Sequence, residues 1–168
     1  MFTPSEISSI QKLLIPGNKI VIITHYNPDG DAIGSSLGLK HFLNKKGLEA
    51  DVIVPNDFPK FLKWMPDSKK IIIADYKRKL AGEAIYNADV IFILDFNASH
   101  RSGNLVGPWI EKAKAKKILI DHHQQPEDFD FVYSDVKVPA TSQMIYHFID
   151  ALNDAELVNQ DIAECLYT

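Results

Sequence analysis

The 168-residue sequence contains a single cysteine, Cys165, and its longest apolar runs are about five residues. One cysteine excludes an internal disulfide and agrees with a reducing compartment. Runs this short exclude a transmembrane helix, which needs roughly 20 apolar residues. The N-terminus also lacks the basic start and apolar stretch of a secretory signal. These absences predict a cytoplasmic protein that has no membrane segment.

The sequence also lacks a dense basic cluster. It has 18 Lys and Arg against 22 Asp and Glu, a formal net charge of −4. Proteins that hold long nucleic acids usually do so with a basic surface, which displaces counterions. The lysine-rich run 111–117 indicates a solvated helix end, and only weakly a patch that attracts phosphate. The charge therefore favours a small anionic substrate over duplex DNA.

Strands and helices alternate along the sequence. With 46% hydrophobic and 24% charged residues, its length suits one globular domain with its own core. Apolar runs predict strands at 19–24, 51–54, 70–73, 89–94, 116–120 and 130–133. Helices are expected at 4–16, opened by a capping box at Thr3 and Glu6, and at 31–46, 76–87, 107–114, 140–152 and 156–166. The pattern predicts an α/β fold, a Rossmann-like parallel sheet of about five strands with helices on both faces.

Acidic residues and histidines follow three of these strands. His25, Asp29 and Asp31 follow the first, Asp95 follows the strand at 89–94, and Asp121-His122-His123 ends the strand at 116–120. Ligands of open parallel sheets bind beyond the carboxyl ends of the strands, so these side chains should meet. Imidazoles and carboxylates are the ligand set of manganese, magnesium and zinc. The pattern predicts a metal-dependent hydrolase.

Each residue also has a simpler interpretation. Asp29 suits an ordinary Pro-Asp-Gly turn, Asp31 could cap the following helix, and Asp95 could cap the next turn. Adjacent histidines on an extended segment point in different directions, so one would bind a metal while the other faces a phosphate or passes a proton. Asp121 would then orient an imidazole. Capping alone leaves the other clusters unexplained, which favours the metal interpretation.

Two further residues are candidates for binding a phosphate. Arg101 could grip a phosphate with two hydrogen bonds, although a surface arginine is a serious alternative. Ser35 lies in the first turn of the helix at 31–46, where free amides suit an anion. Close packing of this helix on the sheet, helped by Gly34 and Gly38, explains the small residues equally well.

The motifs together resemble those of a known family. Residues 24–35 (THYNPDGDAIGS), then Asp95, then Asp121-His122-His123, resemble the first three motifs of the DHH phosphoesterase family, in the same order over roughly residues 20–150. Within it the sequence is most similar to the nanoRNase and 3′-phosphoadenosine-5′-phosphate phosphatase group, related to RecJ exonucleases. Asn97, Arg101 and Ala140-Thr141-Ser142 add to that likeness.

The resemblance implies a site with two divalent cations, most simply Mn²⁺. His25 and Asp29 would bind one cation, Asp31 and His122 the other, Asp95 would bridge them, and His123 would meet the scissile phosphate. The implied substrates are short single-stranded oligonucleotides and phosphoadenosine phosphate, with a homodimer left open. Three alternatives stand: a cyclic-dinucleotide phosphodiesterase of the same family, a non-catalytic nucleotide-binding module, or a domain whose aspartates only cap helices.

The resemblance also implies a fourth motif, an aspartate that completes the second metal site. No such residue follows the expected helix at 156–166. Residues 1–168 are therefore expected to be a catalytic domain truncated before the fourth motif, without the C-terminal substrate-binding domain. Such a chain would have an incomplete second site and be inactive or weakly active.

Overall fold

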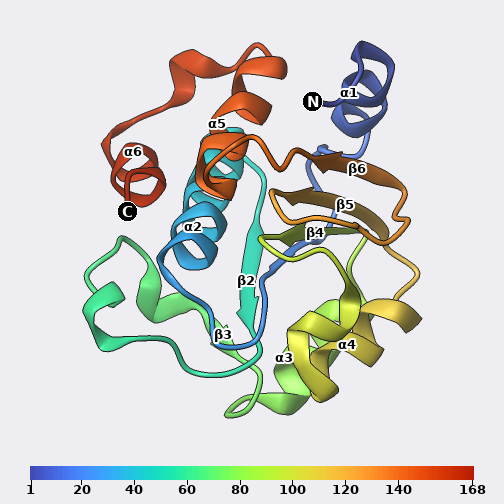
Figure 1. Ribbon diagram of the computed structural model, residues 1–168, viewed down its shortest axis with the longest axis vertical. Coiled ribbons are helices and arrows are strands. Elements are labelled where there is room, and N and C mark those ends of the chain that lie inside the picture. Colours follow the sequence, from blue (N-terminus) through green and yellow to red (C-terminus); the bar gives the residue numbers. More distant parts are fainter.

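A single sheet of six parallel strands organises the protein in a computed structural model that describes residues 1–168 (Figure 1). The strand order is β3-β2-β1-β4-β5-β6. The strands are β1 (Ile20–Ile23), β2 (Ala50–Val54), β3 (Ile72–Ile73), β4 (Val90–Leu94), β5 (Lys116–Asp121) and β6 (Phe131–Ser134). The predicted α/β fold is confirmed, with six strands in place of about five.

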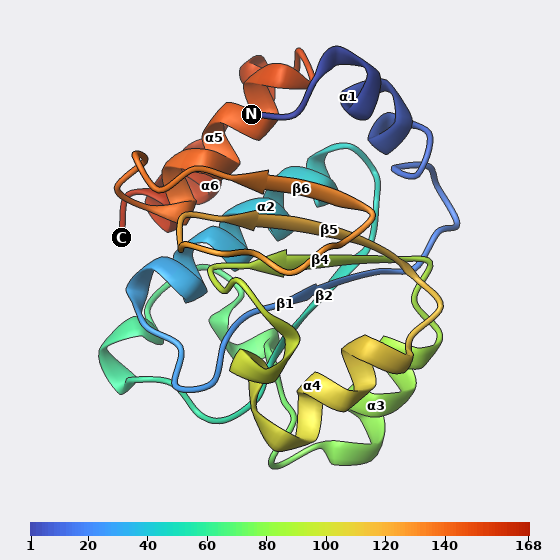
Figure 2. The same cartoon turned by 45° about the vertical axis from the view of Figure 1, so that its right-hand side comes forward.

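The sheet is covered on both faces because its central strands are apolar on both faces. Every residue of β1 and β4 is buried, as expected for parallel strands between helical layers. Helices α1, α2, α5 and α6 cover one face, and α3 and α4 cover the other (Figure 2). Two hydrophobic cores result, one on each side of the sheet.

All six predicted helices are present, but α1 ends five residues earlier than predicted and α6 begins four residues later, because residues 155–157 form a 3-10 turn. The helices are α1 (Pro4–Gln11), α2 (Gly30–Lys45), α3 (Arg78–Tyr86), α4 (Gly103–Lys112), α5 (Thr141–Ala151) and α6 (Gln160–Leu166), with short 3-10 turns at 60–62, 68–70, 99–102 and 155–157. The capping box of Thr3 and Glu6 is present at α1. None of the helices is both long and apolar enough to cross a membrane.

Helix α4 starts four residues earlier than the sequence predicts. The sequence predicts this helix at 107–114, so that Pro108 would fall in its first turn. In the structure the helix begins at Gly103 and Pro108 lies inside it. A proline there removes the hydrogen bond to the carbonyl of Asn104, four residues before it, and its ring crowds that carbonyl. Burial of Val106 and Ile110 against the sheet compensates for that loss.

The strand order reverses beside β1, which fixes where a site can form. β2 pairs with one edge of β1 and β4 with the other, both in parallel. The connections leaving the carboxyl ends of β1 and β4 diverge at this switch point and leave a crevice. The segments that follow β1 and β4 carry His25 and Asp95.

Helices α2 and α6 approach closely through two glycines. A Cβ atom at Gly34 would overlap the carbonyl oxygen of Cys165, and one at Gly38 would lie 2.5 Å from Leu166 Cδ2. The sequence alternative of close packing at these glycines is thus correct, but the partner is α6 and not the sheet. Burial raises the pKa of the Cys165 thiol to about 12, so this thiol stays protonated in the α2–α6 contact.

Candidate metal centre

Three loops at the carboxyl edge of the sheet enclose a cavity of about 370 Å³. They follow β1, β4 and β5, and the segment leading into α5 closes the cavity. The residues that line it are His25, Asp29, Asp31, Asp95, Arg101, His122, His123, Pro139 and Ala140. All five residues expected to bind metal are among them, so the fold does bring the separate motifs together.

Asp95 lies at the bottom of this cavity and faces histidines on two sides. Its side chain is 3% exposed, and its backbone adopts a left-handed conformation with φ of 64°. One carboxylate oxygen, Oδ2, lies 3.5 Å from His25 Nε2, while Oδ1 lies 3.4 Å from His122 Nε2. Asp95 thus presents a different oxygen to each of two motifs that are nearly a hundred residues apart.

The three imidazoles are held in the same way, through Nδ1. His25 Nδ1 donates to the carbonyl of Tyr26 at 2.8 Å, and His122 Nδ1 donates to the carbonyl of Val138 at 3.3 Å. His123 Nδ1 donates to Asp121 Oδ1 at 2.6 Å. Metal-binding histidines usually donate their second ring N–H to a carbonyl or carboxylate, which fixes the tautomer. In all three rings this leaves Nε2 available to a ligand.

The distances between the ligand atoms fit a divalent cation. Nitrogen and oxygen atoms bound to one ion at about 2.1 Å lie roughly 3–3.5 Å apart. The two Asp95 contacts are of that length and are too long for strong hydrogen bonds. Two sets of three residues can each gather their ligand atoms within 4.8 Å: His25, Asp29 and Asp95, and Asp95, His122 and His123. The donor set therefore fits two cations that share Asp95.

The electrostatics of the cavity also favour a cation. Burial, followed by the nearby Asp31 charge, raises the pKa of Asp95 above its usual value, against hydrogen bonds from His25 and Thr141. Burial lowers the pKa of His25, but hydrogen bonds to Asp95 and Tyr26 and the charges of Asp95 and Asp29 outweigh it and raise that pKa overall. Buried carboxylates that repel each other need compensating positive charge.

Asp29 and Asp31 cap different helices. Asp29 Oδ1 accepts from the amide of Ala32 at 3.0 Å and is the N-cap of α2. Asp31, which the sequence suggests as the cap of that helix, instead accepts from the amides of Thr141 and Ser142 at 2.7 and 2.8 Å. Helix α5 needs this acceptor because its own N-cap residue is Ala140. The capping and metal interpretations are compatible, since each carboxylate oxygen has two lone pairs.

The adjacent histidines do not point apart as the sequence suggests. The segment leaves the sheet directly after Asp121, and this bend brings the rings of His122 and His123 to a centroid separation of 4.8 Å in one cavity. His122 Nε2 lies 3.8 Å from Asp31 Oδ2. Asp121 is fully buried, and its Oδ1 orients His123 while Oδ2 has no partner.

The two expected phosphate-binding residues differ in position. Arg101 lies in the 3-10 turn after β4 and lines the cavity, held by a hydrogen bond of 2.8 Å from the Tyr26 amide to its carbonyl. Ser35 is fully buried and its hydroxyl donates to the carbonyl of Ala32 at 3.3 Å. Since Ser35 is not part of the cavity lining, the structure does not bring it to the site.

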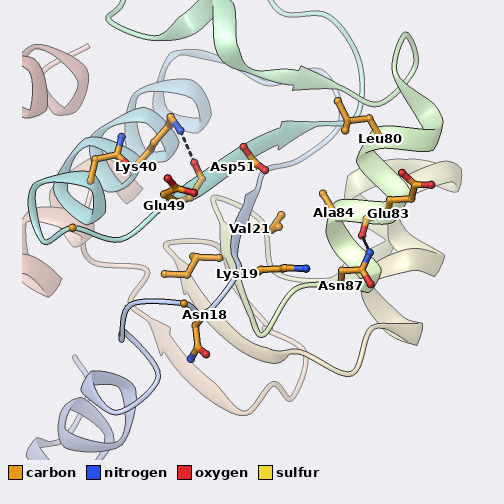
Figure 3. Close-up of a pocket in the computed structure, with 15 residues that line it drawn as sticks. Asn18, Lys19, Val21, Lys40, Glu49, Asp51, Leu80, Glu83, Ala84 and Asn87 are labelled. Carbon is orange, nitrogen blue, oxygen red and sulfur yellow. Dashed lines mark hydrogen bonds between the residues drawn. The ribbon is translucent and has the colours of Figure 1, made fainter.

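A larger cavity, of about 780 Å³, lies at the opposite end of the strands (Figure 3). It is formed by the start of β1, the start of β2 and one side of α3. Figure 3 shows the Lys40 ammonium and the Asn87 amide bonded to main-chain oxygens, those of Ala50 and Glu83. No histidine lines this cavity, and each buried polar side-chain atom that lacks a partner lies elsewhere, in Thr24, Asp121 or Ser142. The histidines and aspartates that could bind a metal therefore line the smaller cavity.

A parallel α/β sheet with histidines and aspartates gathered at its switch point defines a hydrolase-type domain with a candidate metal centre. Residues 19–168 match the model of the DHH family, N-terminal domain. The chain therefore belongs to the DHH family of phosphoesterases, as the motifs predict.

Individual proteins with similar sequences or structures support this assignment. The chain is 37% identical over 134 residues to the bifunctional oligoribonuclease and PAP phosphatase NrnA of Thermus thermophilus, covering 79% of this chain and 37% of NrnA. It is 23% identical over 172 residues to the cyclic-di-AMP phosphodiesterase PdeA of Listeria monocytogenes, covering 94% of this chain and 25% of PdeA. The crystal structure of an exopolyphosphatase-related protein from Bacteroides fragilis superposes with a TM-score of 0.95 at 41% identity, covering 99% of this chain and 49% of that one. The chain thus spans half or less of the length of each.

Proposed function

We propose that this domain hydrolyses phosphate esters of short oligonucleotides, releasing nucleoside 5′-monophosphates, and that it also converts 3′-phosphoadenosine-5′-phosphate to AMP. The observation that carries this proposal is the Asp95 carboxylate, whose two oxygens face His25 Nε2 and His122 Nε2 at 3.5 and 3.4 Å. A shared carboxylate between two groups of ligands is the arrangement expected of a two-cation phosphoesterase. The name and similarity of NrnA support the substrate class.

In this proposal His25 and Asp29 hold one cation and His122 and Asp31 the other, with Asp95 shared and Mn²⁺ the favoured metal. Bound divalent cations would supply Lewis acidity and would lower the pKa of a water molecule. His123, whose Nδ1 donates to Asp121 Oδ1, would contact the scissile phosphate with Nε2. His123 can equally fill the second ligand group with Asp95 and His122, in which case Asp31 acts mainly through helix α5.

The small net negative charge and the size of the cavity support a short substrate. A cavity of about 370 Å³ holds one nucleotide phosphate and its sugar more easily than a duplex. Arg101 supplies a cation at the rim, where it could hold a phosphate with two hydrogen bonds. The location in the cytoplasm and a homodimer remain predictions from sequence.

The test is a manganese titration of the purified chain followed by hydrolysis assays. We expect Mn²⁺ to bind, and Mn²⁺-dependent AMP to appear from a diadenosine ribonucleotide and from phosphoadenosine phosphate. A chelator should abolish both reactions. Failure to bind Mn²⁺ would contradict the metal centre. Binding of Mn²⁺ and of AMP without hydrolysis would instead agree with the expected truncated catalytic domain or with the non-catalytic nucleotide-binding module.

A cyclic dinucleotide belongs in the same assay, because the similarity to PdeA favours this second candidate. Preferential cleavage of cyclic-di-AMP over the linear substrates would replace the proposed substrate class. It would leave the proposed metal centre unchanged, since all three reactions break a phosphate ester bond.

Arg101 provides a specific prediction about substrate binding. Arg101→Ala should raise KM for phosphoadenosine phosphate about tenfold or more, because a charge-assisted contact to phosphate is worth roughly 1.5–3 kcal/mol. Mn²⁺ affinity should stay within about twofold of the unchanged chain. Lys137→Ala, an exposed cation on the approach to α5, is the control and should change neither quantity. An unchanged KM for Arg101→Ala would contradict a role in binding phosphate.

A further inference from the structure

Thr141, the first residue of α5, contacts both central carboxylates of the candidate metal centre. Its side-chain hydroxyl donates to Asp95 Oδ1 at 2.8 Å, while its backbone amide donates to Asp31 Oδ2 at 2.7 Å. Thr141 is fully buried and is not part of the cavity lining. It therefore contacts the candidate ligands from the side away from the cavity and cannot itself reach a substrate.

The Asp95 carboxylate has few other restraints on its orientation. Its side-chain oxygens accept a short hydrogen bond from Thr141 alone, while His25 and His122 lie at distances too long for strong hydrogen bonds. The terminal torsion of an aspartate is broad and can rotate. Thr141 is well suited to prevent this, because its side chain is β-branched and its backbone is anchored to Asp31.

We propose that Thr141 is a positioning residue, whose hydroxyl holds the Asp95 carboxylate so that Oδ1 faces His122 and Oδ2 faces His25. The hydrogen bond uses one lone pair of Oδ1 and leaves the other oxygen free of protein donors other than His25. The inference rests on the proposed function, because the orientation of Asp95 matters only where cations bind on both sides. Groups that orient metal ligands typically contribute 10- to 100-fold to metal affinity.

The helix offers a matched control next to this residue. The hydroxyl of Ser142 is also buried in the first turn of α5, but it makes no hydrogen bond. Removing it deletes a hydroxyl of the same helix turn without touching Asp95. Both residues keep their backbone amides in every variant, so the two hydrogen bonds to Asp31 are retained.

The experiment is a Mn²⁺ titration of metal-free protein, monitored by the electron paramagnetic resonance signal of free Mn²⁺, with no substrate present. Thr141→Val should weaken Mn²⁺ binding by about tenfold or more. Thr141→Ser, which keeps a hydroxyl, should have an Mn²⁺ affinity within about threefold of the unchanged chain. Ser142→Ala should have the same Mn²⁺ affinity as the unchanged chain. If the valine variant does not fold, as judged by its melting curve, Thr141→Ala takes its place.

Equal Mn²⁺ affinity in the valine variant and the unchanged chain would overturn the inference. So would a serine variant as weak as the valine variant, because the hydroxyl would then not be the group that matters. An unchanged chain that binds no Mn²⁺ at all is a different result, which overturns the proposed function itself.

Discussion

Replacing Asp95 by asparagine should abolish Mn²⁺-dependent hydrolysis and, at the same time, make the metal-free protein more stable. The amide keeps the shape of the carboxylate and can accept the Thr141 hydroxyl, and asparagine tolerates the left-handed backbone at φ of 64°. In the proposed site the amide could not be shared between two cations, so activity should fall about 100-fold or more. In the unchanged protein, Mn²⁺ at about 100 times its Kd should add roughly 2.7 kcal/mol of stability, and this gain should vanish in the variant.

The gain in stability follows from the direction of the Asp95 pKa. Burial and the Asp31 charge raise that pKa, so folding favours the protonated acid. This stabilisation is present at pH values below the ordinary aspartate pKa and is lost as the pH rises through the raised pKa. At pH 8 the ionised carboxylate therefore costs folding free energy that an amide does not. A difference of about 1 kcal/mol corresponds to roughly 2–4 °C in Tm.

Thermal unfolding in a chelator at pH 8 and pH 4 checks this prediction. The advantage of Asp95→Asn should be present at pH 8 and shrink at pH 4, where Asp95 becomes neutral and His25, whose pKa is raised, becomes charged. Asp150→Asn makes the same chemical change at an exposed position on α5 and should leave Tm and activity unchanged. A lower Tm for Asp95→Asn at pH 8 would show that Asp95 stabilises the fold without metal.

Replacing Gly34 by alanine should destabilise the protein strongly. The new methyl group would overlap the carbonyl oxygen of Cys165, which is main chain and cannot move away by rotating a side chain. Helix α6 would have to shift from α2, at a cost of about 2–3 kcal/mol. The expected result is a decrease in Tm of roughly 5–10 °C, measured by calorimetry or circular dichroism.

Gly82→Ala in α3 is the matched control for this change. A Cβ atom at Gly82 would meet the Trp109 ring at 3.6 Å, an ordinary van der Waals distance. Alanine should therefore stabilise this helix by about 0.5–1 kcal/mol through the unfolded state. A Gly34→Ala variant as stable as Gly82→Ala would contradict the close α2–α6 contact.

The hydrophobic pattern was enough to predict most of the fold. Uninterrupted apolar runs such as 90–94 can only be buried on both faces, and alternation with helices makes such strands parallel. The capping box at Thr3 and Glu6 predicted the start of α1, because it depends only on residues three positions apart in the chain. The start of α4 was predicted four residues too late. The helix continues through Pro108 because burial of Val106 and Ile110 compensates for a lost backbone hydrogen bond, and burial is a tertiary effect.

Most of the residues that line the cavity were predictable from sequence, while the contacts between them were not. His25, Asp95 and His122 follow strands whose carboxyl ends share one edge, so their meeting follows from the fold class. The position of Ser35 in the first turn of α2 suggested anion binding, but its hydroxyl donates a hydrogen bond to the Ala32 carbonyl of the same helix. The contact between Asp31 and α5 could be anticipated only from the lack of a capping side chain at Ala140. Because alanine cannot accept a hydrogen bond, another residue had to supply the acceptor for this helix.

The sequence by itself determined the parallel α/β fold, the family and the set of histidines and aspartates that form the cavity, because apolar runs and strand-end motifs are local properties of the chain. Only the tertiary structure decided how these residues divide their contacts. It placed Asp95 between His25 and His122 and directed both adjacent histidines into one cavity. It also brought the Thr141 amide within hydrogen-bond distance of Asp31. These contacts join segments up to 110 residues apart, and their geometry depends on how the helices pack on the sheet.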